Sequence, residues 1–286
     1  MRVLIAGSAG QLGRALQASA PPGMTVIAPL ETAFDITDAD VVAAAVAAAR
    51  PDQIINAAAY TAVDKAESDE AAARHINVNA VGLLATAART VGAGFTHVST
   101  DFVFDGTAHY PYSPEAAPNP LGAYGRTKLD GEATAAEFHP RPLIVRTAWV
   151  YAAQGKNFVA TMLRLMHEHD EVRVVADQIG TPTHAASLAR ALWVLINAGE
   201  HGIWHWTDAG VASWYDFAVA VQHEALALGL LTRRATIVPI RTKDYPTPAR
   251  RPAFGVLDKT ATWALTGPAR HWRDELRDCL TEIHRG

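Results

Sequence analysis

The sequence predicts an α/β protein with a Rossmann-like doubly wound parallel sheet and a smaller mixed α/β substrate-binding domain. The first observation is a short apolar run, residues 2–6, that leads directly into a glycine-rich turn and a helix. The second is the repeated alternation of strand-like and helical segments that follows. The third is that small or polar residues follow several of the predicted strands, at the sheet edge where such folds bind ligands.

The composition favours a folded protein with a small-molecule ligand. The chain has 286 residues, of which 49% are hydrophobic and 19% charged, and a net charge of -4. Without a basic stripe, we expect no nucleic acid and no membrane as partners. The single cysteine, Cys279, suits a cytoplasmic protein. The first apolar run stops at a glycine loop and is not expected to be a signal peptide, and the longest, residues 41–49, is too short to span a bilayer.

A glycine-rich turn follows the first strand with the spacing G-x-x-G-x-x-G. Glycine lets the backbone turn tightly and approach a pyrophosphate, which is then held at the N-terminus of the next helix, here residues 14–18. A turn that uses glycine only for its shape is the alternative. The interpretation as a dinucleotide site assigns five residues to the cofactor: Gly7, Gly10, Gln11, Leu12 and Gly13.

The end of the second strand, residues 24–28, is where such folds distinguish their cofactors. An acidic residue there holds the ribose hydroxyl of NAD, and an arginine accommodates the extra phosphate of NADP. Glu31 is a candidate ribose partner, and no basic residue stands between the strand and Asp35. The sequence therefore leaves NADPH and NADH both open.

Residues 34–38 are expected to form a short extended piece against the adenine. Asp35 would accept a hydrogen bond from the adenine amino group, and Ile36 would pack on the ring. Asp35 could instead cap a helix, although Asp38 is the more natural N-cap for a helix that begins at Ala39.

The third strand, residues 53–56, is followed by small residues that would let the backbone lie against a flat cofactor. Ala57, Ala58, Ala59 and Tyr60 are assigned to the cofactor on this basis. A long helix is predicted over residues 69–91. It contains Asn77 and Asn79, and because asparagine is a mediocre helix former, we expect one of them to bond a neighbouring loop. Asn79 is the one assigned to the cofactor site.

A tyrosine and a lysine four positions apart mark the candidate catalytic group. Tyr124 and Lys128 share one face of a predicted helix. An ammonium close to a phenol favours the phenolate, so Lys128 is expected to lower the pKa of Tyr124 from its ordinary value near ~10. Such a tyrosine can give a proton to a keto oxygen, and Thr100, with Asp101 beside it, can donate a second hydrogen bond there. The alternative is that Tyr124 and Lys128 are an ordinary pair of surface residues without a catalytic role.

The regular alternation breaks down after Trp149. We expect an NAD(P)-binding Rossmann domain over residues 1–148 and a substrate-binding domain over 149–286, with certain segments packing back on the first sheet. Strands at 95–99 and 143–146 complete the first part. In the second part the predicted helices are 157–169, 185–198 and 214–227, and the predicted strands are 172–176, 202–206 and 237–240.

The sequence contains no recognisable motif for a metal site or for a serine nucleophile. There is no H-E-x-x-H, and His167 and His169 fall on different faces of a helix. There is also no G-x-S-x-G turn. We therefore predict no metal site and no serine nucleophile.

Six motifs span nearly the whole chain: I-N-A-A-A-Y-T-A-V-D-K-A-E (55–67), S-T-D-F-V-F-D-G (99–106), Y-G-R-T-K-L-D-G-E (124–132), R-T-A-W-V-Y (146–151), D-Q-I-G-T-P-T (177–183) and Y-P-T-P-A-R-R-P (245–252). Together they resemble the dTDP-4-dehydrorhamnose reductase family of the extended short-chain dehydrogenase/reductase superfamily.

The resemblance implies hydride transfer from NADPH or NADH to C4 of a dTDP-linked 4-keto sugar, dTDP-4-dehydro-L-rhamnose. Tyr124 would be the general acid, Lys128 would tune it and hold the nicotinamide ribose, and Thr100 would polarise the keto oxygen with Asp101 in support. Arg251 is the candidate for the substrate pyrophosphate, because guanidinium groups bind phosphate well. The residues assigned to the substrate are Thr100, Phe102, Val103, Trp149, Asn157 and Arg251.

Two positions depart from the family pattern. Phe102 stands where the family often has tyrosine, and Ala15 stands where certain members carry an acid used in a magnesium-bridged dimer. The sequence therefore gives no reason to assume a metal or that dimer, and it leaves open a magnesium requirement, the oligomeric state and a homodimer.

Two other functions stay open at this stage. One is a related nucleotide-sugar reductase or epimerase that keeps Tyr124 and Lys128 but acts on another sugar or base. The other is a non-catalytic cofactor-binding regulatory subunit, like that of methionine adenosyltransferase. The presence of Thr100, Asp101 and Trp149 alongside the pair favours catalysis.

Overall fold

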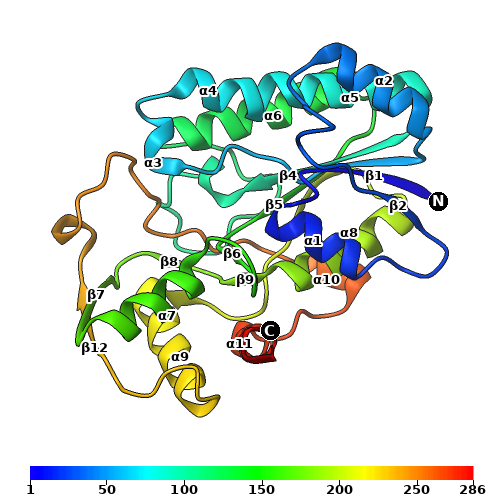
Figure 1. Cartoon of the computed structure of the whole chain (residues 1–286). Helices are drawn as coiled ribbons and strands as arrows, with labels where there is room; N and C mark the ends of the chain where they lie inside the picture. The colour runs from blue at the N-terminus through cyan, green and yellow to red at the C-terminus, as the bar shows by residue number, and fades with distance from the viewer. Residues whose placement is uncertain (286) are drawn as a thin grey trace.

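A computed structural model describes residues 1–285 and shows a six-stranded parallel sheet at the centre of the molecule (Figure 1). The strand order is β10-β5-β4-β3-β1-β2, with every neighbouring pair parallel. The predicted fold class is confirmed. The bounds of the strands are β1 Arg2–Ala6, β2 Thr25–Ile27, β3 Gln53–Asn56, β4 Gly94–Thr100, β5 Leu143–Thr147 and β10 Gly202–His205.

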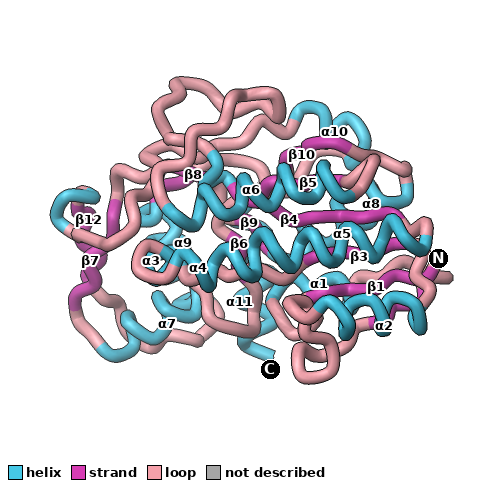
Figure 2. Tube along the Cα trace, turned by 90° about the horizontal axis from the view of Figure 1, so that it is seen from above, coloured by secondary structure: helices cyan, strands magenta, loops and turns pink. Residues whose placement is uncertain are grey.

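Helices cover both faces of this sheet (Figures 1 and 2). One layer contains α2 (Ala39–Ala49), α5 (Ala80–Val91) and α6 (Ala123–Phe138). The other contains α1 (Gln11–Ala18), α8 (Ala185–Asn197) and α10 (Thr260–Thr266). Successive strand residues face opposite layers. In β1, Leu4 therefore packs with Val42 and Leu84 on one side, whereas Val3 and Ile5 pack with Leu16 and Leu188 on the other.

The segment between β2 and α2 differs from its prediction. Residues 34–38 were expected to be extended, and this was wrong. The carboxylate of Asp35 accepts hydrogen bonds from both the backbone N–H and the hydroxyl of Thr37, which folds the chain into a turn. The prediction for Asp38 is confirmed, because its side chain caps the N-terminus of α2.

The long helix predicted over residues 69–91 is divided in three. It consists of α4 (Glu70–Arg74), a π-helical turn (His75–Asn79) and α5, and it is preceded by a short helix, α3 (Val63–Ala66). The π turn carries Asn77 inward, where the side chain is buried and bonds a neighbouring loop. Such single-turn bulges frequently occur at functional sites.

The second half of the chain contributes to the first sheet. β10 pairs with β5 from Gly202 to His205, and α8 packs beside α1. The remaining segments gather around a separate apolar cluster that includes Met166, Phe217 and Trp272. Its elements are α7 (Phe158–Glu168), α9 (Trp214–Ala227), α11 (Trp272–Arg285) and a parallel pair formed by β7 (Glu171–Val175) and β12 (Thr236–Ile240).

Two short strand pairs connect these parts. They are β6 (Val150–Tyr151) with β9 (Thr183–His184), and β8 (Ile179–Gly180) with β11 (Ala212–Ser213). Across the described residues, 1–285, the structure has no helix of the length and apolarity needed to cross a membrane.

Candidate active site

A cleft of about 1160 Å³ opens at the carboxyl ends of β1, β3, β4 and β5. Residues at the N-terminus of α1 line this cleft, and so do Tyr124 and Trp149. The carboxyl edge of a doubly wound sheet is where ligands bind in such folds. Most of the residues assigned to the cofactor by sequence meet here, from segments that are far apart in the chain.

The glycine-rich turn is packed too closely for any other residue. Gly7 has a positive φ of 77°, and a Cβ added to it would lie 2.6 Å from the backbone nitrogen of Ala58. A Cβ on Gly13 would lie 2.1 Å from the carbonyl oxygen of Gly7, so Gly13 holds α1 against the turn and does not line the cleft. Gly10 precedes α1 without a side-chain cap, which leaves helix N–H groups available to an anion.

Acidic side chains line the end of the cleft that follows β2, and an arginine of α1 also lines the cleft. Glu31, Asp35 and Ile36 line it there. The hydrogen bonds from Thr37 lower the pKa of Asp35, so its carboxylate is ionised and already partly engaged. Arg14 also lines the cleft, and its guanidinium donates to the carbonyl of Ala9 and the side chain of Gln154.

The loop after β3 forms the wall predicted for it. Ala57, Ala58 and Ala59 line the cleft, but Tyr60 does not. The side chain of Asn77 holds this loop, because it accepts from the backbone N–H of Tyr60 at 2.9 Å and donates to its carbonyl at 3.3 Å.

The assignment of Asn79 to the cofactor was wrong. Asn79 is exposed and lines a different hollow, between α2 and α5. The sequence showed that one asparagine should bond the loop, but the π turn changes the helical phase and places Asn77 there instead.

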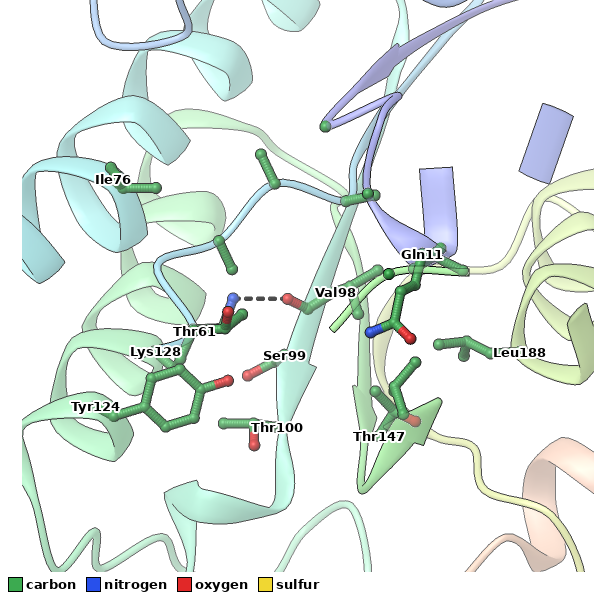
Figure 3. A pocket seen from close by; sticks show the side chains of 18 of the residues that line it. Gln11, Thr61, Ile76, Val98, Ser99, Thr100, Tyr124, Lys128, Thr147 and Leu188 are labelled. Atoms are coloured by element: carbon green, nitrogen blue, oxygen red, sulfur yellow. Dashed lines mark hydrogen bonds between the residues drawn. The ribbon is translucent and has the colours of Figure 1, made fainter. Parts of the chain in front are cut away.

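Tyr124 lies in the first turn of α6, with its hydroxyl directed toward the end of β4 (Figure 3). Burial raises its pKa to about 12, the hydroxyl of Thr100 lowers it in part, and the charge of Asp101 raises it. The phenol therefore carries its proton throughout the physiological range. Phe102 packs edge-on against the ring, with 5.5 Å between ring centroids.

Lys128 is buried below Tyr124 on the same helix. Its Nζ donates to the carbonyl of Val98 at 2.7 Å (Figure 3) and lies 3.4 Å from Nε2 of His97. Burial lowers the pKa of Lys128 to about 8, against the opposing effect of Glu132. The predicted lowering of the Tyr124 pKa by Lys128 was wrong, because the ammonium is turned toward β4 and burial dominates at the phenol.

Thr100 and Asp101 form a coupled pair at the end of β4. The Thr100 hydroxyl donates to the Asp101 carboxylate at 3.1 Å and accepts from the backbone N–H of Phe102 at 3.2 Å. Asp101 is buried, and burial raises its pKa to about 7 although Thr100 lowers it in part. Near neutral pH, Asp101 therefore exchanges between an acceptor-only carboxylate and a carboxylic acid that can donate.

A buried ion pair supports this region from below and was not identified from the sequence. Arg146 of β5 binds both carboxylate oxygens of Glu132 on α6, at 2.9 and 2.7 Å. The hydroxyl of Ser99 on β4 donates to the same carboxylate. All three residues lie in motifs quoted above, but sequence spacing alone does not pair residues from three elements.

The part of the cleft that the sequence assigned to the substrate is built from long side chains. Trp149 adopts a positive φ of 48° and stacks on Trp214, with 3.5 Å between ring centroids and 9° between planes. Both rings line the cleft, and Trp214, the first residue of α9, was missed because a tryptophan in a predicted helix is assigned to the core by default. Arg251 also lines the cleft, with its guanidinium bound to both carboxylate oxygens of Asp64.

Two residues assigned to the substrate lie outside the cleft. Val103 is fully buried in an apolar cluster with Phe104 and Leu257, so the assignment to substrate contact was wrong. Asn157 caps α7, and its amide donates to the side chain of Gln11 at 2.9 Å. It therefore supports the cofactor turn indirectly instead of lining the cleft.

The unpaired groups in the cleft fit a nicotinamide dinucleotide. Thr147 ends β5 beside Thr100, is buried, and has a hydroxyl without a hydrogen-bond partner. It lines the cleft together with the close backbone surfaces of Gly7 and Ala58. A flat ring placed over these surfaces could satisfy that hydroxyl. Among the residues that the structure describes, no group of three or more His, Cys, Asp or Glu side chains is arranged to hold a metal ion.

Comparison with known proteins agrees with this geometry. A family model described as "RmlD substrate binding domain" matches residues 1–285. The dTDP-4-dehydrorhamnose reductase of Burkholderia thailandensis is 44% identical over 99% of both chains. A crystal structure of a dTDP-4-dehydrorhamnose reductase from Clostridium acetobutylicum superposes with a TM-score of 0.93 at 39% identity, covering 99% of both chains. The enzyme of that name from Bacillus anthracis, solved with NADP, superposes with a TM-score of 0.91 at 35% identity, covering 98% of this chain and 99% of the other.

Proposed function

Since the chain belongs to the dTDP-4-dehydrorhamnose reductase family, we propose that it reduces the C4 keto group of dTDP-4-dehydro-L-rhamnose to dTDP-L-rhamnose, using NADPH or NADH. The observation that carries this proposal is the position of Tyr124. Its phenol is protonated and faces the end of β4. It lines the same cleft as the glycine turn and the stacked pair of Trp149 and Trp214. A proton donor in that place suits the reduction of a ketone.

In the proposed mechanism the bound nicotinamide supplies the hydride, and the protein supplies the proton and the orientation. Tyr124 gives its proton to the oxygen that becomes an alkoxide. The hydroxyl of Thr100 has one hydrogen, and in this structure it donates to Asp101. When Asp101 is protonated, it can donate to Thr100 and release that hydrogen for the keto oxygen. Thr100 then polarises the ketone while Tyr124 protonates it.

The remaining cleft residues would bind the two ends of the reactants. The glycine turn and the N-terminus of α1 would hold the cofactor pyrophosphate. Trp149 would pack near the sugar. Arg251 would meet the substrate pyrophosphate, and its pairing with Asp64 would hold the guanidinium in place. We also propose a cytoplasmic location, which suits an enzyme that consumes reduced nicotinamide and keeps one buried free cysteine.

The test is direct turnover with purified protein. dTDP-4-dehydro-L-rhamnose is mixed with NADPH and with NADH in turn, and the loss of reduced-nicotinamide absorbance is followed. Consumption that depends on both reactants supports the reductase and ranks the two cofactors. Tight cofactor binding without consumption would overturn the proposal, and a set of related 4-keto nucleotide sugars would then separate another reductase from a non-catalytic subunit.

A further inference from the structure

The helix that carries Tyr124 receives its N-terminal cap from another part of the chain. α6 begins after Gly122, which has no side chain to bond the free N–H groups of the first turn. The carboxylate of Glu67 supplies this bond instead, since its Oε1 accepts from the backbone N–H of Ala123 at 2.7 Å. A Cβ on Gly122 would collide with the same oxygen. The glycine therefore makes room for a carboxylate from outside the helix, two residues before Tyr124.

Glu67 directly follows α3, a short helix that packs against the first turn of α6. Ala66 of α3 is completely buried in a small apolar cluster that contains Ala123, and Tyr124 packs against this cluster. α3 begins at Val63, which lines the cleft. The cap and the apolar contact together join α3 to the turn of α6 that carries the phenol.

The same short helix also holds Arg251. The carboxylate of Asp64 accepts from both terminal nitrogens of this guanidinium, at 3.1 and 2.8 Å, and from the backbone N–H of Ala249 at 3.2 Å. The hydrogen bond from Arg251 lowers the pKa of Asp64, so the carboxylate is ionised at neutral pH. Asp64 and Glu67 stand three positions apart, and Glu67 keeps a helical backbone conformation. Residues at this spacing are neighbours on one helical face.

We propose that Glu67 is a positioning residue for Tyr124, and that α3 sets the separation between the phenol and the Arg251 guanidinium. The proposal rests on the proposed function, in which the phenol protonates the keto oxygen and the guanidinium meets the substrate pyrophosphate. In a 4-keto nucleotide sugar, C4 lies across the sugar ring from C1, which carries the pyrophosphate. A fixed separation between the two protein groups therefore favours a keto group at C4 over one closer to the pyrophosphate.

The first test measures backbone amide exchange in the full-length protein. We expect the N–H of Ala123 to be protected in wild type and in Glu67→Gln, whose amide oxygen can still accept, and to exchange at least about tenfold faster in Glu67→Ala. Glu70→Ala is the matched control, because Glu70 also binds α6, at 2.9 Å, but through the side chain of Arg126 instead of the backbone. It should leave the exchange of Ala123 unchanged. Equal exchange rates in wild type and Glu67→Ala would overturn the proposed cap.

The second test compares steady-state kinetics of the same variants. Glu67→Ala should lower kcat about tenfold, because the first turn of α6 no longer fixes the phenol, and should leave the substrate KM within about twofold of wild type. Glu67→Gln should restore most of the rate, and Glu70→Ala should behave like wild type. A folded Glu67→Ala protein with wild-type kcat would mean that the cap only stabilises the helix, and it would sink the proposal.

The third test combines substitutions at the two ends of α3. Asp64→Ala should raise the substrate KM about tenfold, with a smaller change in kcat, because Arg251 loses its anchor. If one helix holds both groups at a fixed separation, either substitution already releases it. The double variant Asp64→Ala with Glu67→Ala should then lose less kcat/KM than the product of the two single losses.

Single losses that multiply in the double variant would show two independent contacts and would overturn the role of α3 as a spacer. Absence of turnover in wild type would instead count against the proposed function. The amide exchange of Ala123 is measured without substrate or cofactor, so the cap is tested whatever the outcome of the turnover experiment.

Discussion

The half of the cleft assigned to the cofactor (the cofactor half) and the half assigned to the substrate (the substrate half) are built in different ways. The cofactor half consists of backbone and small residues, Gly7, Gly10 and Ala57–Ala59, at the ends of adjacent parallel strands. The substrate half consists of long side chains that meet from distant segments, such as Trp149 with Trp214 and Arg251 with Asp64. A site made of backbone follows from local sequence, whereas a site made of side-chain pairs follows from the complete fold.

This difference determines what sequence can predict. The glycine spacing predicts the tight turn between β1 and α1 because a side chain at these positions would meet nearby backbone, as the contact between Gly7 and Ala58 illustrates. The pairing of Arg251 with Asp64 spans most of the chain and has no local signal. The error at Asn79 arose because a π turn within the helix, which the sequence pattern did not reveal, changed which asparagine points inward.

The fold was easier to predict than the site for a related reason. Alternating strands and helices, with Asp38 as a helix cap, follow from propensity and capping. Propensity and capping do not predict that β10 joins the first sheet, because a short apolar run carries no information about which strands it pairs with. The pKa values were also beyond reach: the proximity of Lys128 to Tyr124 was predicted, but burial and the direction of Nζ decide the sign of the shift.

The largest expected effect concerns the buried ion pair between Arg146 and Glu132, which lies under the cleft. Arg146→Met leaves Glu132 charged and buried without its partner, so we expect a loss of about 3–5 kcal/mol in the free energy of unfolding. Denaturant unfolding measures it. Arg164→Met, which breaks an exposed pair with Glu168, is the control and should change stability by less than about 0.5 kcal/mol. Equal effects of the two substitutions would refute a supporting role for the buried pair.

The next effect concerns Tyr124, where the two halves meet. Tyr124→Phe should lower kcat by roughly 10²-fold or more because the proton donor is lost. Cofactor and substrate affinities should persist, since the ring and its contact with Phe102 are kept. Steady-state kinetics and equilibrium binding check this. A variant that turns over at close to the wild-type rate would remove Tyr124 from its assigned role.

Gly7→Ala tests the cofactor half alone. The new Cβ would press on the backbone of Ala58 at a residue with positive φ, so we expect the cofactor Kd to rise more than about tenfold, together with a loss of stability. Gly229→Ala is the matched control: it has a φ of 75° but open space around the new Cβ. It should lose stability through strain and keep its cofactor affinity. Similar cofactor Kd values for the two variants would argue against the assigned turn.

Asp101→Asn tests the end of β4, where the two halves of the cleft meet, through the pH dependence of the free energy of unfolding. In the folded protein the pKa of Asp101 is raised from 3.8 to about 7, so the unfolded chain binds fewer protons over that range. Wild-type stability contributed by this group therefore falls as pH rises from near 3.8 to about 7, and the asparagine variant lacks that loss. We expect the variant to gain about 1–2 kcal/mol on wild type between pH 5 and pH 6, inside this window. Parallel stability profiles would contradict the raised pKa.

The smallest expected effect isolates the substrate half. Trp214→Ala removes the ring on which Trp149 stacks, which is worth about 0.5–1.5 kcal/mol beyond area burial. We expect the substrate KM to rise about five- to tenfold, with the cofactor Kd within about twofold. A change confined to cofactor affinity would mean that the two halves are not separable in this way.

The placement of β10 also affects how the protein can be divided. A fragment that ends at residue 148 contains the glycine turn and most of the cofactor wall, but it lacks the strand that pairs with β5. Its sheet would end in an unprotected edge with free backbone N–H and C=O groups, next to an apolar face from which α8 has been removed. Such a fragment is prone to aggregate. The first sheet therefore needs segments from the second half of the chain, and a truncation that keeps the glycine turn usable has to retain α8 and β10.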